Sequence, residues 1–206
     1  MRPSPLPNRC APDGSLHALA ARGLLMGNRG GRLHRDDGTL GVARWRGRAW
    51  IACHLAFRGR RREVWGAGYS ELFFLDEATA LAAGHRPCFE CRRDEARAFA
   101  AAWGRATDIP PPRAEAMDRV LHAERLGQRL RLAAGALPEA AIFARGEGFL
   151  LRTPGGARPW SFAGYGPEQP LDASEIVEAV TPQSVRATLW AGYRPDLHPS
   201  AQFSAR

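Results

Sequence analysis

A pair of cysteines, Cys88 and Cys91, limits the local fold of this chain more than any other motif. They form a C-x-x-C directly before a helical pattern that begins around Asp94. Two intervening residues let both sulfurs reach one tetrahedral zinc ion at ~2.3 Å. Thioredoxin-type redox sites share this spacing, but they follow a strand of a βαβ unit, whereas here a helical segment and Gly84 come first. The context therefore favours a zinc site over a redox site.

A third sulfur comes from Cys53, in a segment that alternates like a β-strand over residues 48–57. Strand parity places Cys53 on one face with Ile51 and Leu55, and His54 on the other face. Cys53 and His54 should therefore not both bind one ion unless the strand bulges. Without a metal, Cys53 would be a small buried hydrophobic residue. Four cysteines in a chain in which no secretion signal is expected should be ligands, catalysts or core residues rather than a disulfide framework.

The segment around the cysteine pair resembles the zinc-binding domain of the Ada family of DNA-repair proteins. The shared pattern over residues 73–96 is FFLDEATALAAGHRPCFECRRDEA: an aromatic strand, an acid-capped helix, and an R-P-C-x-x-C turn. The wider similarity covers residues 45–94. The resemblance implies a zinc site with two further upstream cysteines. Cys53 matches the first of them, whereas Phe57 stands where the family has the second.

This departure changes the chemistry that the resemblance implies. In the Ada family a zinc-bound thiolate accepts a methyl group from a DNA phosphotriester. Four thiolates leave the zinc site with a formal charge of about −2, whereas three leave about −1 and a less nucleophilic sulfur. We therefore expect zinc binding without methyl-acceptor chemistry. The fourth ligand stays open between His85, His34, His54 and water, and Cys10 is the least suitable candidate.

Arginines gather beside both parts of the expected zinc site. All 29 basic residues of the chain are arginine, and the formal net charge is +8. A basic protein is drawn to nucleic acid through phosphate contacts. The expected phosphate-binding residues are Arg58, Arg60, Arg61, Arg62, Arg92 and Arg93. The plain alternative is a solvated basic surface with no such partner.

An enzymatic interpretation competes with simple binding. His34, Asp36, His122 and Glu124 could form a hydrolytic site, for example of a nuclease that acts on nucleic acid or nucleotides, with the zinc only structural. No recognisable nuclease spacing connects them, and Asp36 and Asp37 also suit an ordinary turn.

The rest of the pattern predicts an α+β fold in two parts. A disordered leader is expected over residues 1–14, a small zinc-binding unit over 15–108, and a helix with a small antiparallel β unit over 113–200. The first unit should hold a helix over 15–28, a β-hairpin of 48–57 with 61–65, a strand at 72–75 and a helix capped by Asp76. Three prolines at 110–112 form the linker.

The second part should begin with a helix over 113–134, continue with a β-meander over 142–161 and a strand at 176–180, and end with a helix. For that last helix, Thr181 is the expected N-cap, Pro182 the first residue and Gly192 the end. No apolar run approaches about 18 residues, which excludes a membrane-spanning helix. The prolines near the start do not suit a signal peptide, so none is expected, and a cytoplasmic location is expected.

Overall fold

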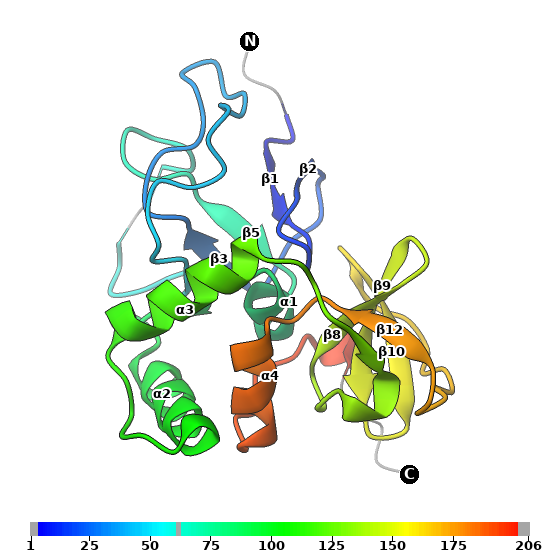
Figure 1. Cartoon of the computed structure of the whole chain (residues 1–206). Coiled ribbons are helices and arrows are strands. Elements are labelled where there is room, and N and C mark those ends of the chain that lie inside the picture. The colour runs from blue at the N-terminus through cyan, green and yellow to red at the C-terminus, as the bar shows by residue number, and fades with distance from the viewer. Residues whose placement is uncertain (1–3, 61–62, 202–206) are drawn as a thin grey trace.

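Two six-stranded sheets and four α-helices make up the described part of the chain, residues 4–60 and 63–201 of a computed structural model (Figure 1). This confirms the expected α+β class. The first sheet and α1 and α2 come from the first half of the chain. Helix α3, the second sheet and α4 come from the second half. None of the described helices combines the length and apolar character that crossing a membrane requires.

The first sheet is mixed and has the strand order β2-β1-β5-β3-β4-β6. Its strands are β1 (Pro7–Cys10), β2 (Leu16–Ala18), β3 (Leu25–Asn28), β4 (Ile51–His54), β5 (Leu72–Phe74) and β6 (Arg86–Pro87). Pairing of β1 with β5 and of β4 with β6 is parallel, and the other pairs are antiparallel. This arrangement brings β4 next to the turn that follows β6.

Three predictions for the first half differ from the structure. The leader expected to be disordered contains β1, because the buried side chains of Asn8 and Cys10 fix it to the sheet. The helix expected over 15–28 is wrong, since β2 and β3 form there instead. The hairpin with 61–65 is also wrong: β4 pairs with β3 and β6, and residues 63–65 lie outside the strands. Residues 61–62 lie outside the described part.

Helices α1 (Glu77–Ala82) and α2 (Arg93–Thr107) flank the C-x-x-C turn. The Asp76 side chain caps α1 by accepting a hydrogen bond from the Thr79 amide at 2.9 Å, as predicted. Gly84 follows α1 with a φ of +79°, a conformation that L-residues rarely adopt. The second helix begins close to the expected residue and continues one turn beyond Gly104, the expected end.

In the second half, α3 (Ala114–Leu126) is shorter than expected, because residues 131–133 form a strand. The second sheet is antiparallel and has the order β11-β10-β9-β8-β12-β7. Its strands are β7 (Arg131–Ala133), β8 (Ile142–Arg145), β9 (Gly148–Thr153), β10 (Gly156–Ser161), β11 (Gly164–Tyr165) and β12 (Ile176–Ala179). This confirms the predicted meander and the strand near residue 176.

Helix α4 (Gln183–Trp190) follows β12. Pro182, rather than Thr181, is its N-cap, so that prediction was wrong by one residue. The hydroxyl of Thr181 instead accepts a hydrogen bond from the Ile142 amide at 2.8 Å and so ties the helix start to β8. Two short 3₁₀ turns, Ala134–Ala136 and Pro199–Ala201, complete the secondary structure of the described residues.

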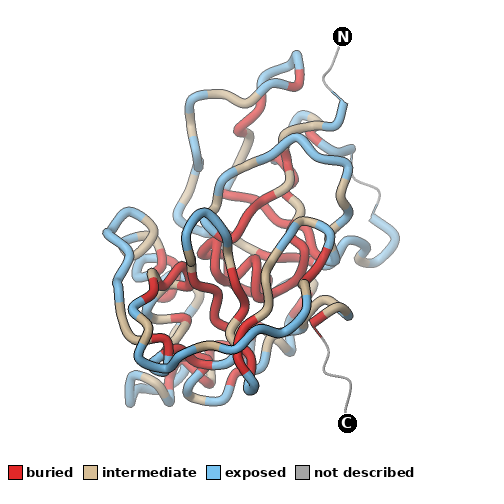
Figure 2. Tube along the Cα trace, turned by 90° about the vertical axis from the view of Figure 1, so that its right-hand side faces the viewer, coloured by how far each residue is buried: buried red, intermediate tan, exposed pale blue. Residues whose placement is uncertain are grey.

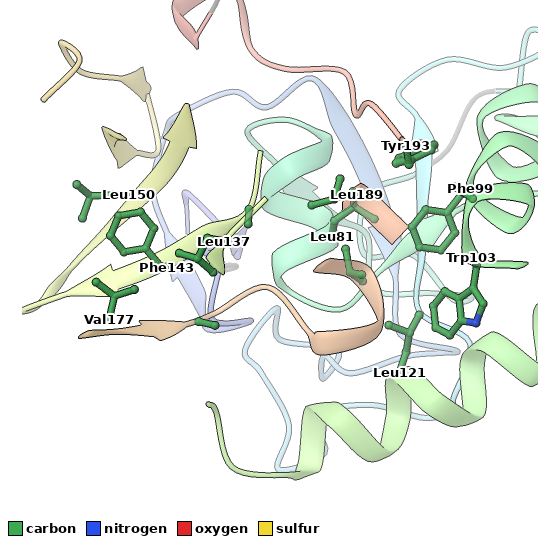
Figure 3. Close-up of a cluster of buried hydrophobic side chains, with 14 of the residues drawn as sticks. Leu81, Phe99, Trp103, Leu121, Leu137, Phe143, Leu150, Val177, Leu189 and Tyr193 are labelled. Carbon is green, nitrogen blue, oxygen red and sulfur yellow. The ribbon is translucent and has the colours of Figure 1, made fainter. Parts of the chain in front are cut away.

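The largest core crosses the proline linker. It contains Leu81 of α1, Phe99 of α2 and Leu121 of α3, together with Phe143 of β8 and Leu189 of α4 (Figure 3). In Figure 2 the buried segments lie in the interior of the molecule, while the loops at the periphery are exposed. Apolar contact therefore joins the two halves of the chain.

Candidate metal centre

Three cysteine sulfurs meet beside the first sheet. The Sγ atoms of Cys53, Cys88 and Cys91 all lie within 4.8 Å of one another. A tetrahedral zinc ion with ~2.3 Å bonds needs sulfurs about 3.8 Å apart, so this cluster is close to the required geometry. Cys53 and Cys88 are buried and Cys91 is partly buried. The donor set therefore fits a zinc ion, and the third sulfur distinguishes the site from a C-x-x-C dithiol.

Backbone pairing positions these sulfurs. Strand β4 carries Cys53, and the Cys88 amide donates to the Ala52 carbonyl oxygen of the same strand at 3.0 Å. The chain then turns, and the Arg92 amide donates to the Cys88 carbonyl oxygen at 3.0 Å before α2 begins. The C-x-x-C turn is thus held at the edge of β4. As parity predicted, Cys53 and Ile51 share one face of the strand, and this face packs against Cys88 and Cys91.

Amide groups also point at the sulfurs. The Glu90 amide donates to Cys88 Sγ at 3.4 Å. A hydrogen bond from the Cys53 thiol, with help from the backbone amides of Cys91 and Glu90, lowers the pKa of Cys88 to about 5 despite its burial. The same hydrogen bond raises the pKa of Cys53. Burial raises the pKa of Cys91, although the His54 amide opposes this shift. The cluster therefore already favours one thiolate.

None of the histidines considered as a fourth ligand joins the sulfurs in the described part of the chain. His85 is fully buried on the opposite side of the sheet, between the rings of Trp50 and Phe74. The ring nitrogens of His34 contact Ser70 Oγ at 2.6 Å and the Gly66 carbonyl oxygen at 3.1 Å.

His54 is exposed, and its Nε2 lies 3.7 Å from Glu95 Oε1. Cys10 is also distant from the triad: it belongs to a separate buried cluster with Leu25 and Phe74. The described residues therefore offer three sulfur atoms that could bind a metal ion, and a water or another small ligand would complete a tetrahedral site.

The structure divides the six expected phosphate-binding arginines. Arg58, Arg60 and Arg93 are exposed. Arg92 is not: its side chain is fully buried and forms an ion pair with Glu77 at 2.9 Å. Its place on a basic face is therefore a wrong prediction, because the Glu77 carboxylate holds the guanidinium beneath the start of α2. Arg61 and Arg62 lie outside the described residues.

Phe57, which replaces the expected second upstream cysteine of the Ada pattern, lies under two of these arginines. The guanidinium carbons of Arg58 and Arg60 lie 5.0 and 5.8 Å from the centre of its ring. Arg60 also forms an exposed ion pair with Glu90 at 2.6 Å. The position supports cationic groups by cation–π contact instead of binding metal.

The residues of the alternative hydrolytic site each have other roles. The Glu124 carboxylate accepts hydrogen bonds from the Ser184 amide and hydroxyl at 2.9 and 2.6 Å, at the start of α4. Asp36 is paired with Arg32 on the surface. The His122 ring packs edge-on against Trp45. The structure thus gives no support to a hydrolytic site built from these residues.

Met26 also packs against Cys53 and Cys88, although the sequence patterns did not predict it there. Met26 lies directly opposite Cys53 in the pairing of β3 with β4, and Phe73 lies beside it in β5. Because residues 15–28 were predicted to form a helix, the pairing of Met26 with Cys53 was not predicted. A strand over 25–28 would have placed Met26 on the cysteine face by parity.

Comparison with known protein families, with curated proteins and with solved structures finds no match to this chain. The cysteine triad is therefore the part of the Ada resemblance that the geometry supports.

Proposed function

We propose that this protein binds one zinc ion through Cys53, Cys88 and Cys91, and that it binds nucleic acid through the arginines beside that site. The observation that carries the proposal is the convergence of three sulfurs within 4.8 Å. Three thiolates so close repel one another, and a divalent cation removes that repulsion. When bound, the ion would crosslink β4 to the turn before α2 and so stabilise the fold.

The nucleic-acid part rests on the charges around the triad. Arg58 and Arg60 follow β4, and Arg93 begins α2, directly after the buried Arg92. With a chain charge of +8, these groups suit contacts to a phosphate backbone. The Ada resemblance, in which this region approaches DNA, agrees with that use.

Zinc content tests the first part. Purified protein should contain one zinc per chain, and Cys53→Ala should lose or weaken that zinc because only two sulfurs remain. Cys10→Ala is the matched control, since it removes a buried cysteine from the other face of the sheet. Equal zinc content in both variants would refute the assignment of the ligands.

Salt dependence tests the second part. The affinity for duplex DNA should fall as salt rises, and the double variant Arg58→Gln, Arg93→Gln should lower the slope of log K against log salt by about 0.9 for each phosphate that is no longer neutralised. Arg119→Gln, an exposed change on α3, should leave the slope unchanged. Equal slopes in both variants would show that the arginines beside the triad do not contact phosphate.

A further inference from the structure

A cavity of about 630 Å³ lies between the two halves of the chain, away from the cysteine triad. It is bounded by the β1–β2 turn, the end of α3 and the start of α4. Five arginines line it, and they come from distant parts of the sequence: Arg29, Arg44, Arg125, Arg129 and Arg186. Two carboxylates, Asp13 and Glu124, also line it.

The two carboxylates do not offset this positive charge fully, because five arginines line the cavity against two carboxylates. Both carboxylates accept hydrogen bonds from neutral serine groups, which hold them in place and leave their charge unchanged. Glu124 uses its two oxygens to hold the amide and hydroxyl of Ser184. Asp13 accepts hydrogen bonds from the amide and hydroxyl of Ser15 at 2.9 and 2.6 Å. Of the arginines, Arg129 has an ion-pair partner, Glu178, at 3.0 Å. The cavity therefore keeps an excess of positive charge.

Arg29 is the most unusual of these arginines because its side chain is only 3% exposed. Its hydrogen-bond partners among the described residues are all uncharged acceptors: the Gly14 carbonyl oxygen at 2.8 Å, Cys10 Sγ at 3.2 Å and His85 Nε2 at 3.4 Å. Burial lowers the pKa of Arg29, and burial also lowers the pKa of His85, which keeps that ring neutral. A buried guanidinium without a carboxylate partner is electrostatically costly.

Arg125, half-buried, repeats this pattern. It donates to the carbonyl oxygens of Gly84 and Arg48 at 2.7 and 2.8 Å, and it forms no ion pair within the described residues. The guanidinium carbons of Arg29 and Arg125 lie 4.0 and 4.2 Å from the centre of the same Trp50 ring. Trp50 thus holds two cations near one another at the wall of the cavity, where their mutual repulsion favours a bound anion.

We propose that this cavity binds the phosphate group of a small organic phosphate of the mononucleotide class. Arginine is suited to this task because its planar guanidinium donates two parallel hydrogen bonds to phosphate. The volume lies in the range that encloses a small organic ligand and greatly exceeds the need of a bare phosphate ion. Apolar side chains such as Leu16 and Val180 complete the lining and would contact the uncharged part of the ligand.

The cavity and the cysteine triad lie on different sides of β4. Cys53 faces the triad, whereas Ala52 belongs to the cluster on the opposite face, with Cys10. The proposal for the cavity therefore does not depend on the proposed zinc or DNA binding, and separate variants test each.

Calorimetric titration of the full chain with adenosine 5′-monophosphate, guanosine 5′-monophosphate and the two free nucleosides tests the proposal. At least one nucleotide should bind, and its nucleoside should not. Arg44→Gln, an exposed change at the rim, and Arg29→Gln should each raise the Kd by about ten-fold or more, since each removes a charged hydrogen-bond donor. Arg119→Gln, outside the cavity, and the Arg58→Gln, Arg93→Gln variant should bind like the parent.

Arg44→Gln keeps the test decisive if Arg29→Gln fails to fold, because Arg44 is exposed. Absence of binding by both nucleotides, or equal Kd values for Arg44→Gln and Arg119→Gln, would overturn the proposal. The source of the phosphate is then found by comparing a 5′-phosphorylated with a 5′-hydroxyl oligonucleotide. Selective binding of the phosphorylated strand points to a nucleic-acid end, and binding of mononucleotides alone points to a free nucleotide.

Discussion

Cys53 and Cys10 are both buried thiols of the same sheet, but they lie on opposite faces in opposite surroundings. Cys53 meets two other sulfurs within 4.8 Å. Cys10 meets a single cation, because Arg29 Nη2 donates to its sulfur at 3.2 Å. One face of β4 thus gathers groups that become anionic, and the other face gathers groups that are cationic.

The difference shows which buried cysteines indicate a metal. Burial raises the pKa of Cys10 to about 11 even though Arg29 opposes the shift, so this thiol is neutral at pH 7 and is satisfied by its neighbours. Among the described residues, the triad has no cation beside it that plays the part of Arg29, and only one of its three sulfurs has a lowered pKa. A shared divalent ion is the partner that would stabilise all three as thiolates.

The largest expected effect comes from Cys88→Ser. This change should remove the zinc and lower the free energy of unfolding by about 4 kcal/mol or more, the range reached when a structural metal is lost. Urea unfolding with metal analysis would measure both. A chelator should destabilise the parent protein and Cys10→Ala, but should have little further effect on Cys88→Ser. If a chelator does not change the stability of the parent protein, the cysteine face of β4 is not stabilised by a metal ion.

Glu77→Gln should have the next largest effect. It keeps the size of the side chain but removes the closest of the three carboxylates that pair with the fully buried Arg92, and breaking a buried ion pair costs about 3 kcal/mol. Because Arg92 follows Cys91, this change weakens the support of the triad without removing a ligand. Zinc content should therefore stay at one per chain while the urea midpoint falls. Loss of zinc together with stability would instead make Glu77 part of the metal centre.

The sequence predicted the triad from two local patterns joined by the Ada resemblance. The C-x-x-C spacing pairs Cys88 with Cys91, and alternation gives the face of Cys53, but only the resemblance placed that face beside the pair. The helix between the two segments was predictable from its Asp76 cap. The meander over β8 to β10 was also predictable, since the turn-forming segments RGEG (145–148) and PGGARP (154–159) separate its apolar runs.

Other features depend on contacts between distant residues. Arg92 has the sequence character of a surface residue, and only Glu77, Glu95 and Asp196, brought near by the fold, explain its burial. The short apolar segment over 15–28 is compatible with a helix or a strand. Its last part forms a strand because residues 25–28 pair with β4 and residues 25–27 pair with β5. The arginine-lined cavity joins residues from position 29 to position 186, so no single motif marks it.

Gly27→Ala should destabilise the sheet on the Cys10 face of β4. Gly27 lies opposite Ala52, and a Cβ there would collide with the Ile51 carbonyl oxygen and approach Cε2 of Phe74 to 2.9 Å. Crowding of this kind costs about 1–3 kcal/mol. Urea unfolding should show the destabilisation, while zinc content stays unchanged because the cysteine face is not altered. A parallel loss of zinc would mean that the two faces of β4 do not act separately.

The smallest effect should appear as a pH dependence at Cys10. Its pKa is raised to about 11 by burial, above the value of about 8.5 for an unfolded thiol. The native state therefore favours the protonated thiol, and this contribution is complete below about pH 8.5 and is lost as pH rises toward 11. At about pH 9 the parent should have lost about 1 kcal/mol relative to Cys10→Ala, compared with about pH 7. Urea unfolding at both pH values measures this difference, and parallel pH profiles for the two proteins would show that Cys10 ionises as readily in the fold as outside it.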